Sequence, residues 1–106
     1  MTAFDIRDLL AAHRQGGRPY HEFLRVPALS TGLYALPAGA NDPQQPHAED
    51  EVYYVLEGEA RFRAGDEDQA VQAGSVLFVP ARVLHQFHSI TRDLTLLVFF
   101  APAESS

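Results

Sequence analysis

GANDPQQPHAEDEVYYVLEG, residues 39–58, is the stretch that decides the fold. Its first half is dense in Gly, Pro, Asn and Asp, which favour turns, and its second half is rich in Val and Tyr, which favour strands. The polar residues Gln45, His47, Glu49 and Glu51 alternate along it. In an extended chain they would all point to one side, but His47 and Glu51 would lie about 13 Å apart. The chain must bend over residues 48–50 if both side chains are to hold one metal ion.

Outward from this stretch, short apolar segments recur with Gly or Pro between them. We expect strands over residues 20–26, 29–36, 51–56, 60–63, 70–72, 75–79, 83–88 and 94–100. Glu57 and Gly58 are expected to form a two-residue hairpin turn, which puts one set of residues inward: Glu51, Tyr53, Val55, Ala60 and Phe62. Residues 2–15 read as a short helix that starts at Thr2 and ends at Gly16-Gly17. This pattern is typical of an all-β sandwich or barrel.

Two spaced motifs resemble those of the cupin superfamily. His47, Glu51 and Gly58 match its first motif, with Gly39 upstream, and a second motif is matched by Gly74, Pro80 and His85. The resemblance implies an all-β fold, a double-stranded β-helix (jelly-roll or cupin barrel), with a short N-terminal α-helix. It divides the chain into a helix and linker over residues 1–18 and a single barrel domain over residues 19–106.

The same resemblance implies a metal site. Its ligands would be His47, Glu51 and His85, with Gln45 as a weaker fourth ligand where the family has a histidine. Two imidazoles and a carboxylate suit a divalent Zn, Fe, Mn or Ni ion. Glu49 could replace a ligand if the bend differs. The expected pocket-lining residues are Tyr53, Phe62, Phe87 and Glu49. Two positions depart from the second motif: Arg82 replaces a Gly, and Ser89 replaces an Asn.

Members of that superfamily have diverse activities, so the fold alone does not give the reaction. We expect a metal-dependent enzyme, an oxygenase or isomerase acting on a small organic substrate. The alternative is a non-catalytic module that binds a sugar or an anion, with or without a metal, and a third possibility is a structural barrel without metal. Residues 94–100 are apolar on both faces, so we expect one face to be covered by the N-terminal helix, the edge of the second sheet or a second subunit. Because small members of that superfamily commonly dimerise through sheet faces, the resemblance implies a homodimer.

Composition excludes several other classes. The 106 residues contain no Cys, so disulfides, thiolate metal sites and thiol nucleophiles are excluded. The formal charge is −6, with Arg as the only basic type besides His, which argues against nucleic acid and anionic membranes as partners. The longest apolar run is too short to span a bilayer, and the first residues do not resemble a signal peptide. We therefore expect a cytoplasmic protein.

Overall fold

The computed structural model describes residues 1–44 and 46–105, and most of them lie in strands. The elements follow in the order α1 (Ile6–Gly16), β1 (Tyr20–Val26), β2 (Leu29–Leu36), β3 (Asp50–Ala64), β4 (Glu67–Gln72), β5 (Val76–Val79) and β6 (His85–Ala101). The expected all-β architecture with one short N-terminal helix is confirmed. No helix in the described part of the chain is long and apolar enough to cross a membrane.

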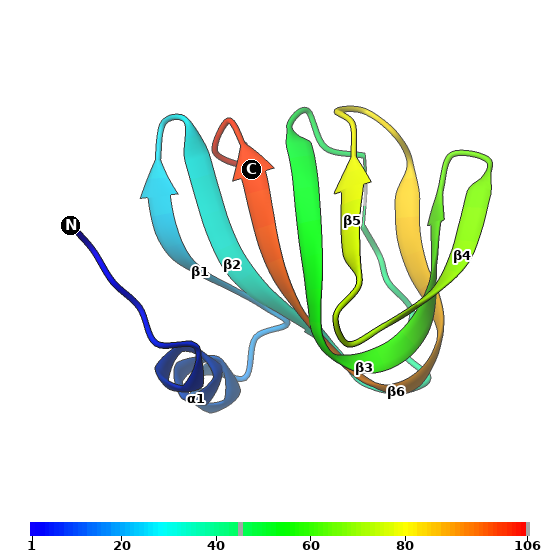
Figure 1. Cartoon of the computed structure of the whole chain (residues 1–106), viewed down its shortest axis with the longest axis horizontal. Coiled ribbons are helices and arrows are strands. Elements are labelled where there is room, and N and C mark those ends of the chain that lie inside the picture. Colours follow the sequence, from blue (N-terminus) through cyan, green and yellow to red (C-terminus); the bar gives the residue numbers. More distant parts are fainter. Residues whose placement is uncertain (45, 106) are drawn as a thin grey trace.

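All the strands join one antiparallel sheet, which curls around a common interior (Figure 1). Its order is β1-β2-β6-β3-β4, with β5 paired to the first half of β3. The long strands β3 and β6 pair with each other along most of their length and bend together. Their first and second halves therefore belong to opposite walls of the barrel, and α1 lies outside it next to β1 and β2.

The hairpin expected at Glu57 and Gly58 is wrong, because β3 runs through both residues without turning back. Gly58 has a φ of 107°, and a Cβ atom there would lie 2.5 Å from the carbonyl oxygen of Asp93. The glycine therefore lets β3 bend against β6 at close approach, and the pairing register shifts between Val55 and Arg61. On β6, the two strands expected over residues 83–88 and 94–100 form one strand in the same way.

The predicted inward face of β3 is nevertheless confirmed. Its members are all at most 7% exposed: Glu51, Tyr53, Val55, Ala60 and Phe62. A bulge in the strand inverts the alternation of side chains just as a two-residue turn does, so the wrong turn still gave the correct face. These residues join inward side chains of β5 and β6, among them Val79, Phe87 and Leu96, to form the core.

The helix starts later than predicted. Asp5 is its N-cap and accepts a hydrogen bond from the backbone N–H of Arg7 at 2.8 Å, so Thr2 lies before the helix. Its end is as expected, because Gly17 adopts a left-handed conformation with a φ of 69°. His13, near this end, is buried and binds the carbonyl oxygens of Arg18 and Pro19. This contact fixes the turn that leads into β1.

Candidate metal centre

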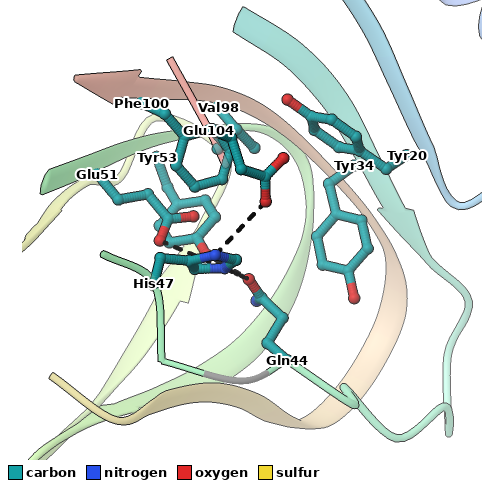
Figure 2. A pocket seen from close by; sticks show the side chains of 9 residues that line it. All are labelled: Tyr20, Tyr34, Gln44, His47, Glu51, Tyr53, Val98, Phe100 and Glu104. Atoms are coloured by element: carbon teal, nitrogen blue, oxygen red, sulfur yellow. Dashed lines mark hydrogen bonds and ion pairs between the residues drawn. The ribbon is translucent and has the colours of Figure 1, made fainter. Parts of the chain in front are cut away.

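A pocket of about 170 Å³ lies against the wall that β1, β2, the second half of β6 and the first half of β3 form. Figure 2 shows the side chains that line it: Tyr20, Tyr34, Gln44, His47, Glu51, Tyr53, Val98, Phe100 and Glu104. They come from β1, β2, β3 and β6, from the loop before β3 and from the segment after β6. The pocket is thus built from distant parts of the chain, and polar groups gather on its His47 side.

His47, Glu51 and His85 converge beside this pocket, which His47 and Glu51 line. One ligand atom from each lies within 4.8 Å of the others. The Oε1 atom of Glu51 is 3.1 Å from Nε2 of His85 and 4.0 Å from Nε2 of His47. The three side chains expected to meet around one ion are therefore brought together, and this arrangement could hold a metal ion.

The bend expected between His47 and Glu51 is present, since the chain bends at Ala48 and Glu49 before β3 begins. Backbone contacts hold this loop against the turn that precedes β6. The N–H of Arg82 donates to the carbonyl oxygen of His47 at 2.7 Å, and the N–H of Ala81 donates to Oδ1 of Asp50 at 2.9 Å. These bonds fix His47 in place relative to β6, whose first residue is His85.

The environment of Glu51 gives the strongest indication that the cluster binds a cation. Its side chain is 1% exposed, and neither carboxylate oxygen has a well-aligned hydrogen-bond donor among the described residues, although Nε2 of His85 lies 3.1 Å from Oε1. A buried carboxylate without well-aligned donors is unfavourable, because the water that solvated it has not been replaced. A cation bound beside it would supply the missing partner. The donor set, with two imidazole nitrogens facing the carboxylate, therefore fits a divalent metal ion.

Both imidazole rings are oriented by contacts on the side away from the cluster. Nδ1 of His85 lies 2.9 Å from the carbonyl oxygen of Val83, which can only accept, so Nδ1 carries a proton. Nδ1 of His47 lies 3.4 Å from Oε2 of Glu104. Each ring thus turns its Nε2 atom toward Glu51, the orientation that metal-binding histidines need. Burial alone lowers the pKa of His85, but the Glu51 carboxylate and the Val83 carbonyl outweigh it and raise that pKa.

Gln44 is also part of the site, although no motif in the sequence marks it. Its Nε2 donates to the buried Asp42 at 2.8 Å, which turns its Oε1 toward the cluster. That oxygen accepts a hydrogen bond from the Tyr53 hydroxyl at 2.8 Å and lies 3.4 Å from Nε2 of His47. An amide oxygen is therefore presented beside the ligand atoms. Gln45, the expected fourth ligand, lies outside the described residues.

Tyr53 lines the pocket next to Glu51. Its side chain is fully buried, and its hydroxyl oxygen lies 3.1 Å from Nε2 of His85. Burial, followed by the negative charge of Glu51, raises the pKa of Tyr53 well above its usual value. The hydroxyl therefore stays protonated and can donate a hydrogen bond or a proton inside the pocket, but it is not a base.

The other residues expected to line the pocket do not border it. Phe62 and Phe87 pack behind Tyr53, with ring centroids 5.6 and 5.1 Å from its own. Glu49 is buried but faces away from the ligand atoms, and its Oε2 accepts hydrogen bonds from Ser105. Tyr53 is thus the one member of this expected group that forms the pocket wall in the described structure.

Several residues that line the pocket could not be predicted from the sequence. Val98 and Phe100 lie on a strand that is apolar on both faces, so the sequence showed neither which face is inward nor that a cavity lies beside it. Tyr20 and Tyr34 lie opposite each other on β1 and β2, and this pairing carries no sequence signal. Glu104 follows the last strand and belongs to no motif.

Arg82 and Ser89, the two departures from the second motif, share one backbone feature. They are the non-glycine residues with a positive φ in the described structure, at 66° and 50°. Glycine and asparagine, which the motif has at these positions, adopt this conformation readily, whereas Arg and Ser are strained in it. The backbone conformation is therefore retained although the residues that favour it are absent.

Among the described residues, the pocket is lined by acidic and aromatic groups and one histidine, without Lys or Arg. Glu51 and Glu104 line it, and no Arg lines it within residues 1–44 and 46–105. Burial, together with the nearby carboxylates of Glu51 and Glu49, raises the pKa of Glu104, although His47 opposes this. A bound anion would find no positive side chain in the described wall.

Comparisons with known proteins agree with this fold. A family model described as a cupin domain matches residues 32–100. The uncharacterized protein SCO3923 of Streptomyces coelicolor is 49% identical over 105 residues, which are 99% of this chain and 100% of that protein. The solved structure of TT1209 from Thermus thermophilus is similar with a TM-score of 0.76 and 28% identity, over 97% of this chain and 99% of that one.

A solved enzyme structure is also similar. The DMSP lyase DddQ from Ruegeria pomeroyi superimposes with a TM-score of 0.67 and 27% identity. The match covers 72% of this chain but 39% of the lyase chain, so this chain spans less than half of that enzyme. The likeness extends to the barrel and not to the rest of the lyase.

Proposed function

This chain belongs to the cupin family and has its double-stranded β-helix fold, and on that premise we propose that it binds one divalent metal ion through His47, Glu51 and His85. We propose further that the protein is an enzyme, an oxygenase or an isomerase, that acts on a small organic molecule beside the ion. A bound ion would supply Lewis acidity and open coordination positions for water or substrate. The protein would supply the ligands, the shape of the pocket and a proton donor.

One observation carries the metal assignment: the buried Glu51 carboxylate lacks well-aligned hydrogen-bond donors and faces two imidazole nitrogens. A purely structural carboxylate at this depth would be expected to accept several hydrogen bonds. Asp42 provides the comparison within the same barrel, since it is 2% exposed and accepts bonds from Tyr34, Gln44 and the backbone of Phe87. Of these two carboxylates, Glu51 and Asp42, the one that faces the histidines is Glu51.

The residues around the ligands have separate roles. Tyr53, which stays protonated, would donate a hydrogen bond or a proton to a substrate oxygen next to the ion. Gln44 offers its amide oxygen as a neutral fourth donor, a role that we also expect for Gln45. Val98, Phe100 and Tyr20 would exclude water from the reacting atoms, because apolar walls strengthen the electrostatic interactions that they enclose.

The pocket restricts the substrate. Its volume of about 170 Å³ is below the roughly 300–1,000 Å³ of pockets for drug-sized ligands, so we expect a compact molecule. A similar barrel occurs in a DMSP lyase, which supports chemistry on a small molecule. The competing function is binding of a sugar or an anion without turnover. The anion version is the less supported one, because the described wall offers no positive side chain besides a protonated histidine.

Metal analysis of the protein purified without added metal is the first test. We expect about one divalent ion per chain, lost in His47→Ala and in His85→Ala. His88→Ala is the matched control, since His88 pairs with Asp68 at 2.8 Å outside the pocket and should not affect metal content. Oxygen consumption and product formation with a panel of compact substrates then separate the enzyme from the binder. Ligand binding without turnover across the panel would favour the second function.

We also propose a homodimer, formed through the outer face of β3 and β5. The most exposed apolar side chains there are Val76 at 66%, Phe78 at 63% and Tyr54 at 39%. Tyr54 pairs with Val76 across the two strands, so these side chains form one continuous patch. Phe78→Glu should convert a dimeric mass in solution to a monomeric one, whereas a monomeric wild-type protein would contradict this proposal.

A further inference from the structure

The segment that follows β6 crosses the edge of the pocket and is anchored on both sides of it. We call residues 102–105 the closing segment. On the β1–β2 side, Ala103 donates its N–H to the carbonyl oxygen of Pro27 at 3.2 Å, and Glu104 donates its N–H to the buried Ser30 hydroxyl at 2.9 Å. The guanidinium of Arg25 donates to the carbonyl oxygen of Glu104 at 2.7 Å. The backbone of Glu104 is therefore fixed from two directions.

On the opposite side, the closing segment binds the loop that carries His47. The N–H and the hydroxyl of Ser105 donate to Oε2 of Glu49 at 3.2 and 2.8 Å. Glu49 is 4% exposed and lies between His47 and Glu51 in the chain. Its buried carboxylate, which does not face the ligand atoms, thus holds the closing segment against the bend that brings His47 and Glu51 together.

These anchors place one acidic side chain against a proposed ligand. The Glu104 carboxylate points into the pocket (Figure 2), and its Oε2 lies 3.4 Å from Nδ1 of His47. The other ring nitrogen, Nε2, lies 4.0 Å from Oε1 of Glu51 and 3.4 Å from the amide oxygen of Gln44, which competes with Glu104 for the ring proton. His47 therefore lies between a carboxylate behind it and the proposed metal position in front of it. His85 is arranged in the same way, with the Val83 carbonyl behind it.

We propose that Glu104 is a positioning residue for the metal site: it holds the proton of His47 on Nδ1 and thereby keeps Nε2 free to bind the ion. A metal-bound imidazole must be neutral, with its proton on the other nitrogen, and a carboxylate at that nitrogen fixes the ring and makes the ligand more basic. This inference rests on the proposed function, because it assigns Glu104 a role in the same metal site.

Metal binding and the seating of the closing segment should favour each other. If Glu104 raises metal affinity by some factor, metal binding must favour the seated closing segment over the unseated one by the same factor. Partners of this kind typically change metal affinity by about 10–100-fold. The N–H groups of Ala103 and Glu104, which bind Pro27 and Ser30, report the seating directly through their hydrogen exchange.

The test compares wild type, Glu104→Ala, Glu104→Gln and Glu22→Gln, each first stripped of metal. Co²⁺ affinity is measured by competition with a chromophoric chelator. We expect Glu104→Ala to bind Co²⁺ about 10–100-fold more weakly, with Glu104→Gln between it and wild type because the amide oxygen can still accept from Nδ1. Glu22→Gln is the control for the loss of one nearby negative charge: its amide oxygen can still accept from Arg25, which anchors Glu104, and it does not touch His47.

Two further readouts separate positioning from a merely structural role. Imidazole ¹⁵N shifts of the metal-free protein should show His47 with its proton on Nδ1 in wild type and a mixture of both tautomers in Glu104→Ala. Hydrogen exchange at residues 103 and 104 should slow when Co²⁺ binds to wild type. Equal Co²⁺ affinity and unchanged His47 shifts in Glu104→Ala would overturn the inference while leaving the metal site intact. A wild-type protein that binds no Co²⁺ would overturn the proposed function, and this inference with it.

Discussion

Oε1 of Glu51 lies 3.1 Å from Nε2 of His85, and each side chain is 1% exposed. The two atoms are held by different parts of the barrel, since Glu51 is near the start of β3 and His85 is the first residue of β6. Their approach places a carboxylate that has no well-aligned hydrogen-bond donor among the described residues against a nitrogen that is turned toward it. Such a pair is well arranged to share a cation between the carboxylate and the ring nitrogen.

Glu51→Gln should separate metal binding from stability. Without its charge the buried side chain is less costly to desolvate, so the metal-free variant at pH 8 should unfold at the same temperature as wild type or higher. Its Co²⁺ affinity should fall by more than about 100-fold, because losing a ligand exceeds the effect of losing a contact behind one. Thermal melts with and without Co²⁺ measure both. A metal-free variant that melts several degrees lower would mean that the carboxylate serves stability instead.

Arg82→Gly should stabilise the protein. Arg82 has a φ of 66°, which costs a non-glycine residue roughly 1–2 kcal/mol, and glycine gives back about 0.5–1 kcal/mol through the extra freedom of the unfolded chain. The N–H that binds His47 is kept. We therefore expect a gain of up to about 1 kcal/mol in the free energy of unfolding, measured by urea denaturation. Arg92→Gly, in an exposed part of β6, is the control and should lose stability. A loss in Arg82→Gly would show that its side chain, and not its backbone, matters.

Tyr34→Phe and Tyr20→Phe should differ in stability although the residues are paired neighbours. The Tyr34 hydroxyl donates to the buried Asp42 at 2.7 Å, so its removal leaves that carboxylate short of a donor and should cost about 1–3 kcal/mol. The Tyr20 hydroxyl is buried without a partner among the described residues, so its removal should be neutral or slightly stabilising. Equal losses in urea denaturation would refute this distinction.

Stability should decline as the pH rises above about 10, the value at which tyrosines ionise in an unfolded chain. Burial raises the pKa of Tyr20 and, together with Asp42, that of Tyr34. The folded protein therefore keeps protons that the unfolded chain loses, so this stabilisation is complete below pH 10 and is lost as the pH rises.

The tyrosinate absorbance of a metal-free Tyr54→Phe variant measures this loss, since the chain has no Trp and Tyr54 is the exposed tyrosine of the described structure. The absorbance should appear together with the loss of β-sheet circular dichroism. Ionisation of the remaining tyrosines near pH 10 in a still folded protein would contradict the burial of their hydroxyl groups.

Much of the fold could be predicted because its signals are local. The bounds of β1 and β2 match the expected ranges, and the inward face of β3 was identified from alternation alone. The bend of β3 at Glu57 and Gly58 could not be distinguished from a hairpin turn. A glycine in a hairpin turn and a glycine that allows a neighbouring strand to approach closely look alike in sequence. The backbone of Asp93, which makes Gly58 necessary, comes from β6.

The site was predictable in part from its motifs. Their resemblance to the motifs of the cupin superfamily implied that His47, Glu51 and His85 converge on one ion. Gln44 and Glu104 could not be found, because each acts through a contact that only the folded chain creates. Gln44 is oriented by Asp42, and Glu104 reaches His47 because the closing segment binds Ser30 and Glu49. Phe62 and Phe87 show the opposite error: they belong to the aromatic core behind the pocket.

The most direct test of the account is the metal content of the purified protein, measured by mass spectrometry for wild type, His85→Ala and the control His88→Ala. The account predicts about one divalent ion per chain in wild type and in His88→Ala, and close to none in His85→Ala. Wild-type protein that stays free of metal after incubation with Zn²⁺, Fe²⁺, Mn²⁺ and Ni²⁺ would contradict it, as would a His85→Ala protein that retains a full equivalent.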